Sequence, residues 1–395
     1  MRLLPRPVLL VSLATASSLL GDQLLYAVLP SHFAELGLLP FQVGLILSAN
    51  RIVRLVTNHL AEHLCRRLAA GVLLTLSLVA GACITAVYGL SSSFAILLLA
   101  RICWGMCWSF IRQIGLMTVV DTAVEGHMGR LMGFYSGISR LGSISGNLVG
   151  ALGHDLVGFT AILLIFSAVS LLSVPLGPLS RRGHPSRQDA ASAAGTAGSA
   201  SWPLLLCGLV VGCVGQGILA STLGFMLLEE VGASAEIGGL SIGVATLTGM
   251  MLASRWVADL AAPLMGALTD RIGVRTGAFC FFVLGGVSLL CAGVLPGASA
   301  LVGAVLLFYV CATGVGVTLS AQAGLRGPRA VASYVTASDL GSALGPNLGW
   351  LAFQFELPTG AILLLASGLY VLAGIVAGVF LRHESPGRRA RVSGP

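Results

Sequence analysis

Long apolar segments separated by short polar breaks follow one another along the whole chain. A helix needs roughly 20 mainly apolar residues to cross a bilayer, and the breaks leave twelve such segments. We predict membrane-spanning helices over residues 8–29, 41–63, 69–90, 93–118, 130–154, 157–178, 203–228, 236–266, 275–295, 299–322, 328–353 and 359–381. The first apolar run continues to Pro30 and another span follows it, so we expect a retained helix and not a cleaved signal peptide. The pattern predicts an all-α integral membrane protein.

One long polar interruption divides the twelve segments into two sets of six. Residues 179–202 are rich in alanine, serine and glycine and contain three arginines, a composition typical of a flexible linker. We therefore expect an N-terminal six-helix bundle over 1–178 and a C-terminal six-helix bundle over 203–383. A short tail would follow at 384–395.

The arginines indicate the orientation of the chain in the membrane. Sixteen of the 22 basic residues fall before the first predicted helix, in the linker, in the tail or in loops on the same side, and the opposite loops contain none. They are Arg2, Arg6, Arg66, Arg67, Arg130, Arg181, Arg182, Arg187, Arg271, Arg275, Arg326, Arg329, Arg382, Arg388, Arg389 and Arg391. Positive loops face the cytoplasm, so we predict a multi-pass protein of the bacterial inner membrane with both termini cytoplasmic.

Composition excludes several other classes of protein. Only 9% of the residues are charged, 56% are hydrophobic and the mean hydropathy is +0.94, so lipid surrounds most of the chain. The net charge of +7 does not indicate nucleic acid, because no basic run is interleaved with aromatic residues. The nine cysteines are scattered through apolar segments without metal-site or disulfide spacing. We expect no cofactor and no metal, and we expect a monomer.

An internal repeat relates the two halves. Residues 139–150, SRLGSISGNLVG, match residues 338–349, SDLGSALGPNLG, at an offset of 199. Each segment carries three glycines spaced by four residues, a stripe that lets another helix approach closely. The glycines are Gly142, Gly146 and Gly150 in the first half and Gly341, Gly345 and Gly349 in the second, where Pro346 follows Gly345. Two matching stripes predict a duplicated fold with pseudo-symmetric halves.

The same alignment places Arg140 and Asp339 at equivalent positions with opposite charges. We expect the glycine stripes to mark where the halves meet. One interpretation is an ion pair between Arg140 and Asp339 that opens and closes during a transport cycle.

The loop after the eighth predicted helix carries a recognisable motif. Residues 266–275 read GALTDRIGVR, which resembles the Gly-x-x-x-Asp-Arg-x-Gly-x-Arg loop of the major facilitator superfamily. The resemblance covers essentially the whole chain and implies a transporter that works by alternating access. It also implies that Gly266, Asp270, Arg271, Gly273 and Arg275 form a latch that stabilises one state of the cycle.

Other segments resemble the same family less closely. In the first half the matching loop, residues 58–67, has Asn58, Glu62 and Cys65 in place of glycine, aspartate and glycine, so we expect a weaker latch there. Arg101 and Gly105 resemble an Arg-x-x-x-Gly motif associated with proton coupling. The stripe around Gly142 resembles a motif of exporters, although Asn147 replaces the usual proline.

A short histidine motif lies in the second predicted helix. His59, Glu62 and His63 have the residue order of an inverted zinc-peptidase motif. That chemistry also needs another carboxylate ligand and a water-filled cleft, so we expect no metal at these residues.

Several charged residues remain inside the predicted spans. An arginine at the bilayer centre costs about 2.5 to 3.5 kcal/mol, so each needs water, a carboxylate or substrate beside it. The candidates for substrate binding or proton coupling are Asp22, Arg51, Arg54, Arg101, Arg112, Arg140 and Asp339; Arg255 and Asp259 are also intramembrane. The alternatives are that these arginines extend to the membrane surface or form permanent ion pairs.

Asp22 lies past the midpoint of the first predicted helix, near Gln23 and Tyr26. Burial favours the protonated form of such an acid and a neighbouring arginine favours its ionised form. That balance suits a proton carrier, and a permanent salt bridge is the alternative.

These features predict proton-coupled export of a small organic solute. One alternative is proton-coupled uptake of an anionic metabolite, which the arginines would favour. Another is a membrane sensor or assembly factor without flux. We expect no enzyme, because the sequence contains no nucleophile paired with a base and no phosphate-binding loop.

Overall fold

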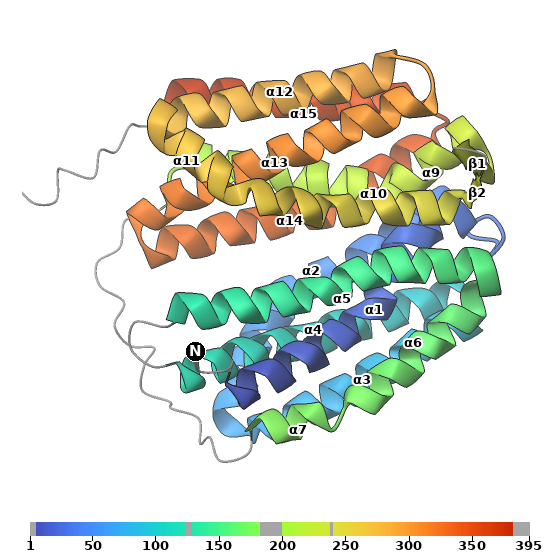
Figure 1. The fold of residues 1–395 in the computed structure, drawn as a ribbon, viewed down its shortest axis with the longest axis vertical. Helices are drawn as coiled ribbons and strands as arrows, with labels where there is room; N and C mark the ends of the chain where they lie inside the picture. Colours follow the sequence, from blue (N-terminus) through green and yellow to red (C-terminus); the bar gives the residue numbers. More distant parts are fainter. Residues whose placement is uncertain (1–4, 124–127, 182–199, 238–239, 382–395) are drawn as a thin grey trace, which may run out of the picture. The chain divides into compact units, whose positions relative to one another are not determined.

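The computed structural model describes residues 5–123, 128–181, 200–237 and 240–381. Most of the linker and the tail predicted from the sequence lie outside these residues. Figure 1 shows a chain made almost entirely of long helices. In order they are α1 (Arg6–His32), α2 (Pro40–Arg67), α3 (Ala70–Leu90), α4 (Phe94–Thr122), α5 (Met128–Val157), α6 (Phe159–Ser173), α7 (Leu176–Arg181), α8 (Trp202–Val211), η1 (Gly212–Leu219), α9 (Ala220–Val231), α10 (Val244–Ala258), η2 (Asp259–Ala261), α11 (Ala262–Ile272), α12 (Val274–Val294), α13 (Ala298–Arg326), α14 (Pro328–Gln354) and α15 (Thr359–Phe380).

These elements form the twelve predicted spans, three of which are interrupted. The interrupted spans are α6–α7, α8–η1–α9 and α10–η2–α11. Within the described ranges, eight spans are long and apolar enough to cross a membrane by length and composition alone. The other four, α2, α5, α10–α11 and α14, contain intramembrane charged residues. The predicted all-α, twelve-helix fold is confirmed.

The start of the predicted span 236–266 is wrong. The strands β1 (Ser234–Ile237) and β2 (Leu240–Gly243) form a small antiparallel hairpin, and α10 begins only at Val244. The sequence there alternates between polar and apolar residues around two glycines, which favours a hairpin over a helix. The helical segment then continues beyond 266 to Ile272.

Local residue chemistry explains the interruptions. The π-helical segment η1 contains three glycines, which weaken regular helix. Pro263 follows the 3₁₀ turn η2 and lacks the backbone N–H that a continuous helix would use. Pro175 likewise separates α6 from α7.

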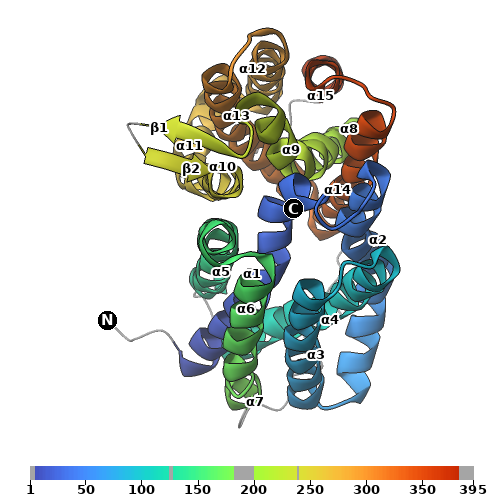
Figure 2. The same cartoon turned by 90° about the vertical axis from the view of Figure 1, so that its right-hand side faces the viewer.

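The glycine stripe of α5 packs against α1, which lies beside it in Figures 1 and 2. A methyl group at Gly142 would overlap the backbone of Ala16, and one at Gly146 would lie 2.7 Å from the carbonyl oxygen of Leu20. At Gly150 it would lie 2.9 Å from Leu24. The contacts advance by four residues on both helices, so α1 and α5 run parallel and in register.

The second stripe makes equivalent contacts. A methyl group at Gly341 would overlap the carbonyl oxygen of Leu209 in α8, and one at Gly349 would lie 2.8 Å from Thr222 in α9. Gly345 and Pro346 lie between them and are buried in α14. Our expectation that the stripes mark where the halves meet stays a prediction, because these glycines show only which helix of the same half they contact. Each stripe packs on the first span of its own half, because small side chains let neighbouring helices approach closely.

Contacts between residues divide the chain into two compact units. One comprises Met1–Ala193, Gln216–Trp256 and Ser342–Thr359, and the other comprises Ala194–Gly215, Val257–Gly341 and Gly360–Pro395. The bundle boundaries proposed from the sequence stay a prediction.

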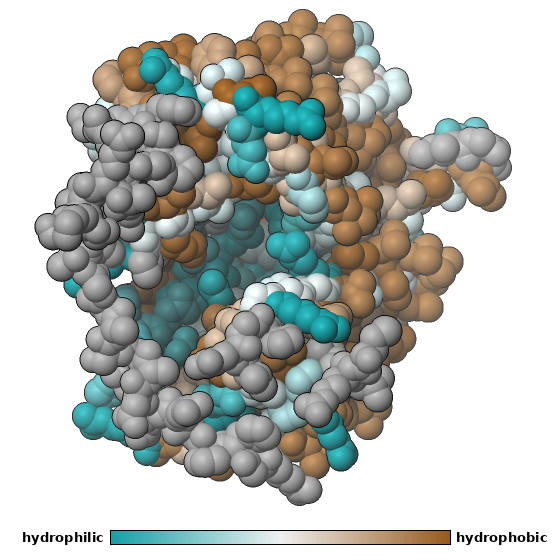
Figure 3. Space-filling model, turned by 60° about the vertical axis from the view of Figure 1, so that its left-hand side comes forward, coloured by the Kyte–Doolittle hydropathy of each residue, from teal (hydrophilic) through white to brown (hydrophobic). Residues whose placement is uncertain are grey.

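Large apolar side chains cover much of the helix surface, as Figure 3 shows in brown for one face. Leu172 is 81% exposed and Leu260 is 78% exposed. Such side chains suit contact with lipid tails.

Candidate functional site

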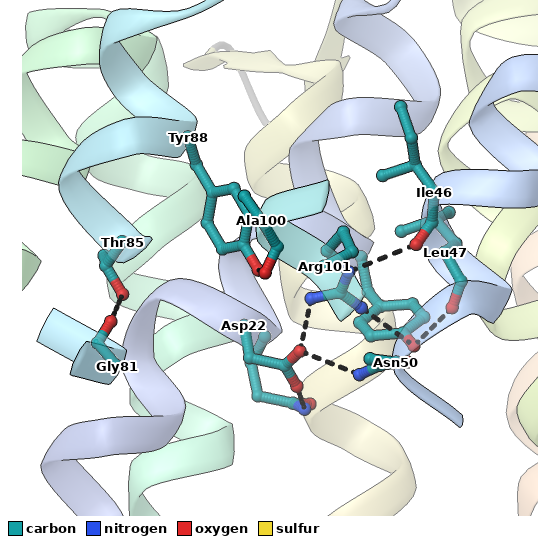
Figure 4. A network of polar contacts seen from close by, with 11 residues as sticks. Asp22, Ile46, Leu47, Asn50, Gly81, Thr85, Tyr88, Ala100 and Arg101 are labelled. Atoms are coloured by element: carbon teal, nitrogen blue, oxygen red, sulfur yellow. Dashed lines mark hydrogen bonds and ion pairs between the residues drawn. The ribbon is translucent and has the colours of Figure 1, made fainter. Parts of the chain in front are cut away.

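A buried ion pair between α1 and α4 forms the centre of the candidate site. Arg101 is fully buried and Asp22 is 7% exposed. Nη1 of Arg101 lies 2.5 Å from Oδ1 of Asp22, as Figure 4 shows. A charge in such an environment must be paired and hydrogen-bonded. The structure thus brings together two of the residues that the sequence singled out for proton coupling.

The other two guanidinium nitrogens of Arg101 also donate hydrogen bonds. Nε donates to the carbonyl oxygen of Ile46 at 3.2 Å, and Nη2 donates to the hydroxyl of Tyr26 at 3.3 Å. The Tyr26 hydroxyl donates in turn to the carbonyl oxygen of Leu47 at 3.0 Å. The guanidinium lies 5.5 Å from the ring centroid of Tyr26 and 5.9 Å from that of Tyr88. It is therefore held in a defined orientation by three helices besides its own.

Asp22 accepts two further hydrogen bonds. The side-chain amide of Asn50 donates to Oδ1 at 3.2 Å, and that of Gln23 donates to Oδ2 at 3.0 Å. Because an ionised carboxylate only accepts, the NH₂ group of Asn50 must face Asp22 and its carbonyl oxygen must face away. That buried oxygen has no hydrogen-bond partner among the described residues.

Gly105 explains how α4 approaches α2 closely enough to build this network. A methyl group at Gly105 would lie 2.6 Å from the carbonyl oxygen of Asn50. Arg101 stands one helical turn before Gly105, just as Ile46 stands one turn before Asn50. Because the spacing is one turn on both helices, the contact between Gly105 and Asn50 places the guanidinium of Arg101 beside Ile46.

Arg51 joins α2 to two other elements of its unit. Its Nη1 donates to the carbonyl oxygens of Gln216 at 2.7 Å and Ser342 at 2.9 Å. Its guanidinium also lies 5.1 Å from the ring centroid of Tyr26. Gln216 belongs to the π-helical segment η1, a type of irregularity that is frequent at functional sites. Tyr26 thus contacts both Arg51 and Arg101.

Arg140 lies apart from this network. Its guanidinium is 5.4 Å from the ring centroid of Trp256, and that of Arg255 is 4.4 Å from the same ring. Asp339 is half-buried in α14 and belongs to the other compact unit. The ion pair between Arg140 and Asp339 therefore stays a prediction.

Arg54 and Arg112 are half-buried in α2 and α4, respectively. Neither belongs to the hydrogen-bond network drawn in Figure 4. Their proposed roles in substrate binding or proton coupling stay predictions.

The predicted latch residues differ in what the structure requires of them. Gly273 has a φ of 85°, a conformation that favours glycine, and it separates α11 from α12. The Nε of Arg275 donates to the carbonyl oxygen of Gly378 in α15. A methyl group at Gly266 would lie 3.6 Å from Val317, an ordinary contact, so packing within this unit does not require glycine there.

The other latch residues, Asp270, Arg271 and Glu62, are exposed. Their part in a latch stays a prediction.

His59 and His63 are exposed on α2 near Glu62. In the part of the chain that the structure describes, no group of three His, Cys, Asp or Glu side chains could hold a metal ion.

The sequence analysis missed Asn50 and Tyr88, which belong to the site, and Trp256, which contacts Arg140. Asn50 precedes Arg51 in a polar run of α2 and could have been found from that run. Tyr88 and Trp256 carry no such signal, because single aromatic residues are common in membrane helices. Their roles follow only from the helix packing.

Comparison with known families gives a match over more than half of the chain. The sequence model of the Major Facilitator Superfamily matches residues 11–261. These residues include the whole network around Asp22 and Arg101.

Individual protein sequences match a shorter part of the chain. The synaptic vesicular amine transporter of Homo sapiens is 32% identical over 137 residues, and that of Rattus norvegicus gives the same values. The match covers 33% of this chain and 26% of either relative. The chain thus aligns with about a quarter of the length of these curated relatives.

Solved structures match nearly the whole fold. A bacterial homologue of the human lysosomal transporter Spinster, in an inward-facing and occupied conformation, has a TM-score of 0.76 at 16% identity and covers 96% of this chain and 98% of its own. A mutant of the nucleoside transporter NupG has a TM-score of 0.76 at 14% identity and covers 95% and 100%. At these identities the likeness concerns the fold.

Proposed function

The chain belongs to the Major Facilitator Superfamily, and from this premise we propose that it exports a small organic amine in exchange for protons by alternating access. Secondary transport follows from the family. The direction, the coupling ion and the substrate class are the parts that we propose. The bacterial inner membrane, with both termini cytoplasmic, is the proposed location.

The buried pair of Asp22 and Arg101 is the observation that carries the proposal. Protonation of Asp22 would cancel its charge and weaken its bond to Arg101, while Arg101 would keep its contacts with Ile46 and Tyr26. The ionic part of the α1–α4 contact therefore depends on one proton, while the Tyr26 contact does not. A contact of this kind can couple proton binding to the change of access.

An amine suits the acceptors around Asp22. The unpartnered carbonyl oxygen of Asn50 and the Oδ2 of Asp22 could both accept from an ammonium group. The likeness to the vesicular amine transporters supports the same class of substrate. A cation and a proton would then compete for one carboxylate, which is the basis of exchange.

Reconstituted protein in proteoliposomes tests the proposal. Antiport predicts that vesicles with an acidic interior accumulate a radiolabelled aromatic monoamine, and that an acidic exterior does not drive uptake. Asp22→Asn should abolish the gradient-driven flux, and Asp22→Glu should retain part of it. Glu35→Gln is the matched control, because Glu35 is an exposed acid just beyond α1 and its loss should leave the flux unchanged.

The same assay distinguishes the alternatives. Uptake of an anion is favoured by Arg51 and Arg140 and predicts that a radiolabelled dicarboxylate enters with protons from an acidic exterior. A sensor or assembly factor predicts no flux of either probe under any gradient. Either result would contradict amine export.

A further inference from the structure

Asp155, near the end of α5, caps the first turn of another helix. Its Oδ2 accepts from the backbone N–H of Thr246 at 2.9 Å and from the Thr246 hydroxyl at 2.5 Å. Thr246 is the third residue of α10, so its amide has no acceptor within its own helix. The N-terminal end of a helix also attracts negative charge. The carboxylate therefore ties α5 to α10.

Gln354 makes the corresponding contact between α14 and α2. Its Oε1 accepts from the backbone N–H of Phe41 at 3.4 Å. Phe41 is the second residue of α2, so its amide is also without an acceptor in its own helix. This contact is longer than that of Asp155, and its acceptor is neutral.

The internal repeat relates these two capping contacts to each other. Gln354 follows Asp155 by 199 residues, the offset that aligns the two glycine stripes, and Thr246 follows Phe41 by 205. Glycines one turn along the capped helices, Gly44 in α2 and Gly249 in α10, are also 205 residues apart. The repeat thus relates the capping residues and the capped helices.

The helix contacts next to the two capping residues follow the same internal repeat. A methyl group at Gly249 would overlap the carbonyl oxygen of Asn147 and lie 2.7 Å from Ala151. A methyl group at Gly44 would lie 3.1 Å from the carbonyl oxygen of Pro346 and 2.9 Å from Trp350. Pro346 and Trp350 follow Asn147 and Ala151 by 199 residues. All these contacts lie within one compact unit.

We propose that Asp155 and Gln354 are paired gating residues of unequal strength on the membrane face opposite the arginine-rich loops. The neutral contact between Gln354 and α2 opens first, and the charged contact between Asp155 and α10 opens last. The inference rests on the alternating access of the proposed function. It adds an order of opening that the motifs of the sequence do not contain.

Hydrogen–deuterium exchange of the full-length protein in nanodiscs tests the contacts directly. After correction for intrinsic rates, the Phe41 amide should exchange faster than the Thr246 amide. Asp155→Ala should speed exchange at Thr246 by about fivefold, the ratio typical for loss of one capping acceptor. Asp155→Asn, which keeps an acceptor without the charge, should give an intermediate rate. Glu236→Ala removes an exposed negative charge from β1 and should change neither amide.

Gln354→Glu supplies the opposite change. A carboxylate at this position should slow exchange at Phe41, because it adds charge to the capping contact. A purely destabilising effect of substitution could not slow exchange. The proposal is overturned if the Phe41 amide exchanges no faster than the Thr246 amide. Unchanged Thr246 exchange in Asp155→Ala, or unchanged or faster Phe41 exchange in Gln354→Glu, overturns it as well. If Asp155→Ala does not fold, Asp155→Asn and Gln354→Glu decide.

The exchange experiment does not depend on flux. A protein that moves no amine could still show both capping contacts, and amine flux without them would leave the proposed function standing. Failure of one proposal is therefore distinguishable from failure of the other.

Discussion

Arg101 shows why a single residue type is needed at the centre of the candidate site. Its guanidinium reaches Asp22, Ile46 and Tyr26 in three directions from one fully buried position. A lysine carries the same charge on one nitrogen and cannot reproduce that planar arrangement of donors. The sequence predicted the importance of Arg101 and Asp22 because charges are costly in a bilayer. It could not predict that the two meet, because contacts between α1 and α4 depend on packing.

We predict that Arg101→Lys lowers the proton-driven flux by at least about tenfold. Losing one charge-assisted hydrogen bond corresponds to at least that factor. Proteoliposome uptake measures the effect. Arg130→Lys serves as the control, because Arg130 is exposed and its guanidinium lies 5.6 Å from the ring centroid of Phe134, away from the candidate site. A flux equal to that of the unmodified protein would show that charge alone suffices at residue 101.

At the scale of single helices, the glycines of α5 have different surroundings. Gly142 meets the backbone of Ala16, whereas Gly137, five residues earlier, has open space around it. The sequence predicted helix packing at the stripe from the spacing of its glycines. It did not identify the partner, because a small-residue stripe suits any neighbouring helix, and α1 became evident only from the structure.

The two glycines therefore predict opposite effects of the same substitution. Gly142→Ala should destabilise the protein by about 1 to 3 kcal/mol, because the backbone of α1 cannot move aside cheaply. Gly137→Ala should leave stability unchanged or raise it by up to about 1 kcal/mol, since alanine favours helix. Thermal unfolding in detergent compares the two variants. Equal shifts in Tm would contradict the assigned packing.

Across the whole molecule, the lengths of the apolar segments predicted the twelve spans, although the start of the span at 236–266 was wrong. The hairpin of β1 and β2 was missed, because its apolar residues were counted as part of a long hydrophobic segment. The position of the linker also could not predict the two compact units, because those units depend on which helices pack against each other. The repeat alignment at an offset of 199 also relates residues beyond the glycine stripes, because it pairs Asp155 with Gln354.

The orientation of the chain in the membrane predicts which side the hairpin of β1 and β2 faces. The hairpin should face the side opposite the linker, because the arginines favour a cytoplasmic linker. In intact cells, a membrane-impermeant maleimide should label Glu236→Cys and should label a cysteine at Ser192 in the linker only after permeabilisation. Labelling of the unmodified protein gives the background from its own nine cysteines. The reverse pattern would invert the proposed orientation.

The register of the glycine stripe on α1 limits how these two helices can move. Gly142, Gly146 and Gly150 meet α1 at three successive turns, and a shift by one residue would press Leu141 or Ser143 into the space that a glycine now leaves. Sliding would therefore require a jump of a full turn, about 5.4 Å. The two helices should therefore move as one rigid unit, so a displacement of α1 at Asp22 also moves the end of α5 that holds α10.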